Sequence, residues 1–296
     1  MKTFKQFIFE SEKPKEYEII SNSHGAHASC DRFKKTTSNK KPKEYEIISN
    51  SHGTHANLPT KLKENTEHPS IKTHFLPNIE SDEDRHHHNS TMNKRLMDLH
   101  ETHQHTSKGK FHLNEFTRGS SKITRDLIRH HTEGAPLEHE HEHFVHNLDK
   151  HCFVPAKHKF DTYSGVGFNI KNAEPAGKSK QGNPVYHQPT YLSSSIDKHV
   201  ANTFAKTSAS KNGSTDTHIL HWHHNENDPV GIVGNDSEYQ DEREVLIPRT
   251  ESTKDRHHIE HMGTDLYTGE SGHTVHVHHV RRIPESEITK DPNEKV

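Results

Sequence analysis

A short apolar run, Val245 to Ile247, places the strongest constraint on the fold of this chain. Pro248 follows it, and a short apolar run bounded by turn residues predicts a buried strand. Two glutamates, Glu242 and Glu244, lead into the run. Because side chains alternate faces along a strand, we expect these two carboxylates to point the same way. Like charges repel at close range, so the pair marks either a functional site or an ordinary exposed strand end.

The segment 190–205 predicts a strand, a hydroxyl-rich corner and a helix. A short apolar approach leads into three consecutive serines, Ser193, Ser194 and Ser195. Apolar residues then recur at helical spacing as far as Phe204. Ser195 suits the N-cap of this helix because its hydroxyl can accept a hydrogen bond from a free backbone N–H.

A third segment, 161–168, lies upstream of the serines and reads DTYSGVGF. Its glycines, Gly165 and Gly167, are expected to let the backbone approach a ligand closely, since glycine has no side chain beyond hydrogen.

In order and spacing, the segments 163–165, 193–195 and 242–244 resemble the mono-ADP-ribosyltransferase family of the Arg-Ser-Glu type, in the branch that includes bacterial exotoxins and phage-encoded enzymes. That family has an aromatic-Arg-Gly strand, a Ser-Thr-Ser strand-to-helix motif, and Glu-x-Glu before an apolar strand. Segment 116–127 is also similar to a helix near the start of such domains, and the resemblance covers about residues 95–285.

The resemblance implies transfer of ADP-ribose from NAD to a protein, with release of nicotinamide. In that reaction Glu244 stabilises the cationic ribose, Ser193 orients Glu244, and Glu242 aligns the acceptor. In the family, a glutamate at the first position accompanies arginine acceptors. The expected acceptor is therefore an arginine of a host protein, with RNA polymerase and translation proteins as candidates by resemblance.

Six residues are thereby expected to contact NAD: Ser164, Gly165, Ser193, Ser194, Ser195 and Phe204. Phe204 matches a position where an aromatic ring packs on nicotinamide, and its alternative interpretation is plain helix core. Ser164 stands where the family has an arginine that holds an NAD phosphate. Either another cation takes over that contact, or NAD is held mainly through backbone groups.

Helices precede strands along the chain, which indicates an α+β fold. By resemblance, the strands form the mixed or antiparallel β-sandwich of the ADP-ribosyltransferase type. Beyond a first helix near residue 91, the expected helices are 114–131, 137–150 and 195–206. The expected strands are 160–168, 188–193, 217–223, 229–233, 243–248 and 273–282. In the last strand valines alternate with histidines, which predicts one buried face and one wet face.

Residues 1–90 are expected to form a disordered, histidine-rich region, which the acidic patch 80–84 ends. The segment 13–28 recurs at 41–56 with one difference, and two copies are too few for a solenoid. Residues 1–10 resemble the capsid-targeting peptides of T-even-type phages. That resemblance implies residence inside a phage head and later in the host cytoplasm.

The transferase domain is then expected at 91–285, with a C-terminal tail at 286–296. Apolar residues make up only 26% of the chain, so a single core cannot use its whole length. The formal net charge of −3 gives no electrostatic argument for binding nucleic acid or an anionic membrane, and no apolar run approaches the length of a membrane span.

The 34 histidines are scattered in small clusters, which we expect at the surface. A designed zinc site would require a compact ligand set of fixed spacing, and the sequence displays none, so no metal site is predicted. Two alternatives to the transferase stay open. One is a histidine-rich metal-binding or structural head protein with a degenerate transferase domain, and the other is an NAD glycohydrolase.

Overall fold

The computed structural model describes residues 75–76, 79, 81–233, 240–269 and 273–289. The chain divides into two compact units, and all of these residues belong to the unit that includes Pro69–Val296. The predicted N-terminal segments 1–10, 13–28 and 41–56 lie outside the described residues.

The described residues contain four α-helices: α2 (Asp82–Thr102), α3 (Ser107–Glu133), α4 (His139–His151) and α5 (Lys198–Lys211). Helix α2 begins with a capping box, in which Ser81 and Asp84 each accept from the other's backbone N–H. The acidic patch expected to end a disordered region is thus the start of a helix, where negative charge is stabilised by the helix dipole. Residue 91, the predicted start of the ordered domain, falls inside α2. None of the helices in the described ranges is both long and apolar enough to cross a bilayer.

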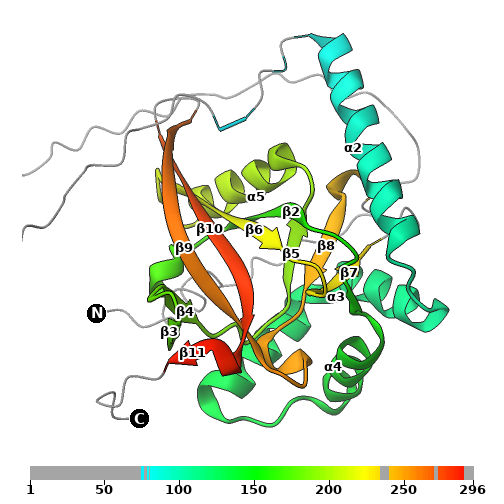
Figure 1. The fold of residues 1–296 in the computed structure, drawn as a ribbon, viewed down its shortest axis with the longest axis vertical. Helices are drawn as coiled ribbons and strands as arrows, with labels where there is room; N and C mark the ends of the chain where they lie inside the picture. The colour runs from blue at the N-terminus through cyan, green and yellow to red at the C-terminus, as the bar shows by residue number, and fades with distance from the viewer. Residues whose placement is uncertain (1–74, 77–78, 80, 234–239, 270–272, 290–296) are drawn as a thin grey trace, which may run out of the picture. The chain divides into compact units, whose positions relative to one another are not determined.

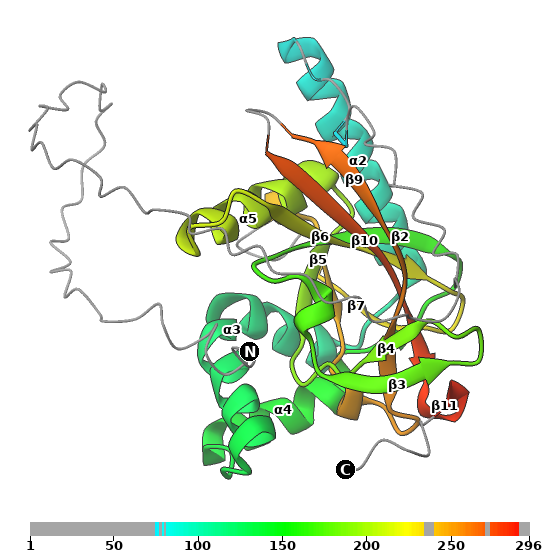
Figure 2. The same ribbon diagram turned by 90° about the vertical axis from the view of Figure 1, so that its left-hand side faces the viewer.

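The strands are β1 (Val154–Pro155), β2 (Phe160–Val166), β3 (Pro175–Ser179), β4 (Pro184–Tyr186), β5 (Leu192–Ser195), β6 (Thr217–His224), β7 (Pro229–Ile232), β8 (Glu244–Ile247), β9 (His257–Thr268), β10 (Thr274–Pro284) and β11 (Ile288–Thr289). They form one sheet in the order β1-β7-β8-β5-β2-β6-β10-β9-β4-β3-β11. Its pairs are antiparallel except for β6 and β10, which run parallel, so the sheet is mixed. The predicted α+β class, with helices before a mixed sheet, is confirmed (Figures 1 and 2).

Strand β8 is buried on both faces. Val245 and Ile247 belong to a core cluster that also contains Leu96 of α2. Leu246 faces the other way, into a second cluster with Phe116 of α3. A strand that is covered on both faces has apolar residues at consecutive positions. The apolar run Val245–Ile247 was therefore sufficient to predict β8.

Helix α5 packs directly on β2 at Gly165 (Figure 1). A Cβ atom at this position would lie 2.1 Å from the backbone oxygen of Ala201 and 2.5 Å from the backbone nitrogen of Ala205. Glycine is therefore needed at position 165 because α5 lies so close to β2. The sequence had suggested that a bound ligand lies close to the backbone at this position.

The predicted wet face of strand 273–282 is largely covered. Val275 and Val277 are buried as expected, but His278 on the opposite face is only 1% exposed. Its ring nitrogens lie 3.1 Å from Nδ1 of His218 and 2.9 Å from the hydroxyl of Thr264. Burial lowers the pKa of His278 to about 3, so this imidazole is a neutral part of the interior.

Other histidines also serve as neutral internal hydrogen-bonding groups. Nε2 of His105 accepts from the backbone N–H of Ile232 at 3.0 Å, and Nε2 of His224 lies 2.9 Å from the hydroxyl of Thr162. Burial lowers the pKa of His105 to about 4 and that of His224 to about 3. The expectation that the histidines lie at the surface is wrong for these residues.

Candidate active site

A cleft of about 480 Å³ lies beside β5, between α5 and the turn that leads into β8. It is lined by seven of the residues singled out from the sequence: Gly165, Ser193, Ser194, Ser195, Phe204, Glu242 and Glu244. Thr117 and Ser120 of α3 and Tyr163 of β2 also line it, although the sequence analysis gave these three residues no role of their own. The three motifs, distant in sequence, thus form one concave site.

Glu244 is the first residue of β8 and only 6% exposed. The hydroxyl of Ser193 acts on its carboxylate, as the family resemblance predicts. Burial is the main cause that raises the pKa of Glu244 to about 7; Ser193 opposes the shift, and the nearby Glu242 adds to it. The catalytic role of this pair stays a prediction.

Glu242 belongs to a 3₁₀ turn, Gln240–Glu242, and not to β8. Arg243, between the two glutamates, has a φ of 49°, in the left-handed region. The expectation that strand alternation aligns Glu242 and Glu244 is therefore wrong, since the turn brings Glu242 to the cleft. Burial also raises the pKa of Glu242 above its usual range.

Arg243 is a residue of this region that the sequence analysis missed. Its side chain is buried, and Nη1 lies 2.9 Å from Oδ2 of Asp197. On its other side, Nε donates to Oδ1 of Asn93 at 3.0 Å and Nη2 donates to Oδ1 of Asn89 at 3.1 Å. The residue between the glutamates thus joins their turn to α2 and to the start of α5. No local pattern signals this, because the partners are far away in sequence.

The serine corner is organised by backbone contacts. The hydroxyl of Ser194 donates to the backbone oxygen of Val245 at 2.6 Å, and that of Ser195 accepts from the backbone N–H of Asp197 at 3.0 Å. Strand β5 continues through Ser195, and Asp197 caps α5 by accepting from the N–H of His199 at 2.9 Å. Ser195 is therefore not the N-cap of α5.

Ser164 does not line the cleft. It is 2% exposed, and its hydroxyl accepts a hydrogen bond of 3.0 Å from Nε1 of Trp222 in the core. Its neighbours Tyr163 and Gly165 line the cleft instead, because side chains alternate along β2. The prediction that the Ser164 side chain contacts NAD is corrected accordingly.

Phe204 projects from α5 and is 47% exposed, so the alternative that it is plain helix core is wrong. It lies in the lining of the cleft, where an aromatic ring is available to a ligand.

No model of a known protein family and no curated protein sequence matches this chain. Among solved structures, Plx2a, an ADP-ribosyltransferase toxin from Paenibacillus larvae, aligns with 15% identity over 68% of this chain and 96% of its own, at a TM-score of 0.41. C3stau2 from S. aureus with NAD aligns with 14% identity over 71% and 99%, at 0.43. ADP-ribosyltransferase Vis in complex with agmatine aligns with 16% identity over 72% and 91%, at 0.46. Alignments with these TM-scores do not show what activity the chain has. The activity is therefore inferred from the residues of the cleft.

Proposed function

We propose that this protein is a mono-ADP-ribosyltransferase, which transfers ADP-ribose from NAD to a protein and releases nicotinamide. The observation that carries the proposal is the convergence of Ser193, Glu242 and the buried carboxylate of Glu244 on one cleft. The order of the three motifs along the chain supports the same function.

The reaction breaks the bond between the nicotinamide nitrogen and C1 of the ribose. The bonding electron pair leaves with nicotinamide, so positive charge develops on the ribose, as it does in glycoside cleavage. A carboxylate fixed in a site of low dielectric stabilises that charge strongly. Glu244 supplies the carboxylate, and Ser193, beside it in the cleft, lowers its pKa and so favours its ionised form.

The proposed acceptor is an arginine side chain of a host protein. A guanidinium has a very high pKa, so it becomes a nucleophile only with a nearby carboxylate to align it and take its proton. Glu242 lies at the same cleft on the turn before β8, where it is half-buried. It is assigned this task. RNA polymerase and translation proteins are the candidate targets, and delivery from a phage head is part of the same proposal.

Lys198 is the proposed substitute for the missing phosphate-binding arginine. It is the first residue of α5, and its ammonium nitrogen lies 5.2 Å from the ring centroid of Tyr163, which lines the cleft. A charge-assisted contact with a phosphate is worth about 1.5–3 kcal/mol. Lys198→Gln is therefore expected to raise KM for NAD about 10- to 100-fold with little change in kcat.

The proposal is tested by two rates on the full chain: nicotinamide release from NAD, and incorporation of labelled ADP-ribose into host-lysate proteins. We expect both with the wild type, and a loss of about 10²–10³-fold in both for Glu244→Gln. Glu226→Gln, at an exposed glutamate outside the cleft, serves as the matched control and should leave both rates unchanged.

Release of nicotinamide without any labelled protein would instead identify an NAD glycohydrolase. The absence of both rates in a correctly folded protein would favour the histidine-rich structural alternative. Mapping the modified residues by mass spectrometry then decides whether the acceptor is arginine.

A further inference from the structure

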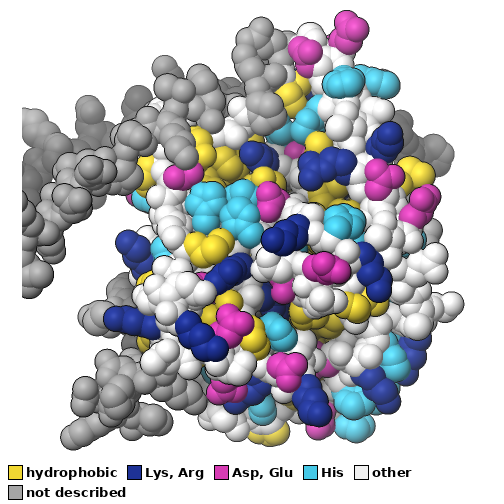
Figure 3. Space-filling view, in the orientation of Figure 1, with side chains coloured by type: hydrophobic (Ala, Val, Ile, Leu, Met, Phe, Trp, Pro, Cys, Tyr) yellow, Lys and Arg dark blue, Asp and Glu magenta, His cyan; other side chains and the backbone are white. Residues whose placement is uncertain are grey.

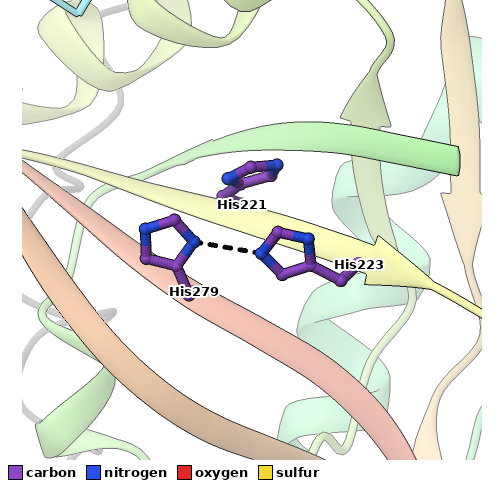
Figure 4. A group of neighbouring side chains, drawn as sticks. All are labelled: His221, His223 and His279. Atoms are coloured by element: carbon purple, nitrogen blue, oxygen red, sulfur yellow. Dashed lines mark hydrogen bonds between the residues drawn. The ribbon is translucent and has the colours of Figure 1, made fainter.

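Three histidines from two neighbouring strands converge on one face of the sheet. His221 and His223 lie two residues apart on β6, so they share a face, and His279 reaches them from the adjacent strand β10. Figure 4 shows the three rings grouped over these strands. One nitrogen atom from each ring can be chosen so that all three atoms lie within 4.8 Å of one another.

The rings are close and partly open to solvent. Nε2 of His223 lies 3.0 Å from Nδ1 of His279, and the ring centroid of His221 is 4.1 Å from that of His223 and 5.0 Å from that of His279. Their side chains are between 14% and 34% exposed. The space-filling view shows histidines gathered on this face, over β6 and β10, with acidic side chains beside them (Figure 3). A small ion can therefore reach the cluster from solvent.

Two carboxylates flank the rings from the next strands on either side. Asp161 of β2 holds Oδ1 3.0 Å from Nδ1 of His223 and Oδ2 3.4 Å from Nε2 of His221. Asp265 of β9 holds Oδ2 3.2 Å from Nε2 of His279. Histidines that bind metals characteristically donate their second ring N–H to such a carboxylate, which fixes the tautomer.

These carboxylates determine which ring nitrogens carry hydrogen. An ionised carboxylate only accepts, so Nδ1 of His223 and Nε2 of His279 must be the protonated nitrogens. In a neutral imidazole the other nitrogen then carries a lone pair. The hydrogen bond of 3.0 Å between His223 Nε2 and His279 Nδ1 therefore requires an additional proton on one of the two nitrogens (Figure 4), and a metal cation can take the place of that proton.

We propose that His221, His223 and His279 bind one Zn²⁺ ion, with Asp161 and Asp265 orienting the rings and water completing the coordination. Zn–N bonds of about 2.0–2.1 Å in a tetrahedral arrangement place two ligand nitrogens about 3.3 Å apart, close to the observed separation of His223 and His279. Ion and carboxylates together tie four consecutive strands, β2, β6, β10 and β9.

The kinds of side chain present distinguish this cluster from the other groups of possible metal ligands in the described part of the chain. Those groups are His131 with His187 and Glu251, and Asp126 with Glu138 and His141. Their carboxylates are already engaged, since Arg249 donates to Glu251 at 3.2 Å and Arg129 donates to Asp126 at 2.6 Å. The group on β6 and β10 offers three imidazoles, which are ligands that suit zinc.

The cluster lies beside the cleft wall: Tyr163, which lines the cleft, stacks on His221 with the ring centroids 4.5 Å apart. A bound ion is thus expected to stiffen this wall, although it contributes no group to the proposed transfer reaction.

The test uses the full chain stripped of metal and titrated with Zn²⁺ against a competing chelator, so that weak binding by other histidines is masked. We expect one tight site per chain. His223→Gln and His279→Gln should each weaken it by about 100-fold or more, and Asp161→Asn by about 10- to 100-fold. The matched control is His276→Gln, which removes a half-buried histidine from the opposite face of β10 and should change the affinity little.

Co²⁺ provides a second measurement on the wild-type chain, which does not depend on the folding of any variant. Four-coordinate Co²⁺ absorbs visible light far more strongly than six-coordinate Co²⁺, so the site should give an intense spectrum that Zn²⁺ displaces. A weak six-coordinate spectrum, or equal zinc affinity in the wild type and both ligand variants, would overturn the proposal. Either result would mean that the three imidazoles do not form a tetrahedral zinc site.

Discussion

Nη1 of Arg243 lies 2.9 Å from Oδ2 of Asp197, and both side chains are at most 5% exposed. This ion pair connects the residue between the two candidate glutamates with the N-cap of α5. Asn93 of α2 accepts from the same guanidinium. The position of the Glu242 turn therefore depends on side chains that make no contact with the cleft.

Asp197→Asn is expected to reduce the free energy of unfolding by about 3 kcal/mol, because it leaves Arg243 as a buried charge without its partner. Asparagine is also a good N-cap, so the substitution keeps the cap of α5 and isolates the loss of charge. Urea denaturation measures the effect. Glu115→Gln breaks the exposed pair with Arg118 and should cost less than about 1 kcal/mol. Equal effects of the two variants would contradict the assigned importance of the buried pair.

Two truncations are expected to differ in activity. Removal of residues 1–74 should leave transfer intact, because the described residues that line the cleft all lie between Thr117 and Glu244. Removal of 1–90 also deletes His88, 3.0 Å from Asp197, and Asn89, which accepts from Arg243. That shorter chain should lose most of its transfer activity and unfold at a lower temperature. Matching activities would show that the start of α2 is dispensable.

The sequence was informative where structure is local. The run Val245–Ile247 predicted β8 because apolar character is a property of consecutive residues, and the motifs on β5 and β8 meet because their strands pair. Alternation along β2 turns Ser164 into the core, whereas the family resemblance placed a phosphate-binding side chain at this position.

Other features depend on contacts between residues that are far apart in the sequence, and such contacts leave no periodic pattern of residue types. The guanidinium of Arg243 is buried among partners from distant segments: Asp197 at the start of α5, and Asn89 and Asn93 on a helix far upstream in sequence. Likewise, His279 meets His221 only through the parallel pairing of β10 with β6. Parallel pairing of distant segments leaves no signature in the spacing of the ligands, which is why the sequence indicated no metal site.

Gly165→Ala is expected to destabilise the protein by about 1–3 kcal/mol, because the added methyl group meets the backbone of α5, which can move only with the whole helix. Gly119→Ala is the matched control. A Cβ atom at Gly119 has no atom within 4 Å, and its φ of −136° suits any residue, so this change should be neutral or stabilising. Thermal unfolding of both variants checks the contrast, and a fully stable Gly165→Ala would show that α5 does not pack on β2 as described.

The pKa of about 7 for Glu244 predicts two opposite pH effects. Only the ionised carboxylate stabilises the ribosyl cation, so kcat/KM for NAD hydrolysis should rise with pH through about 7. Stability changes the other way: the folded-state pKa exceeds the usual 4.5, so the wild type loses stability as pH rises from 4.5 to about 7.

Glu244→Gln removes this ionisation. The variant should therefore be more stable than the wild type at pH 8, by at most about 3 kcal/mol, and the difference should shrink towards pH 4.5. Denaturant titrations at both pH values measure it. A gain in stability that is the same at both would exclude burial of an ionised Glu244 as its cause.

The final prediction concerns the division of work between the two glutamates. Hydrolysis and transfer pass through the same ribosyl cation, so both should require Glu244. Glu242 is carried by a separate turn and aligns only the acceptor, and a group that positions one reactant matters only in reactions that use that reactant. Glu242→Gln should thus lose arginine modification while keeping a measurable part of NAD hydrolysis.

The experiment compares nicotinamide release without acceptor and label incorporation with acceptor for each variant. Equal loss of both rates in Glu242→Gln would contradict the division, and an unchanged transfer rate would make Glu242 an ordinary surface glutamate.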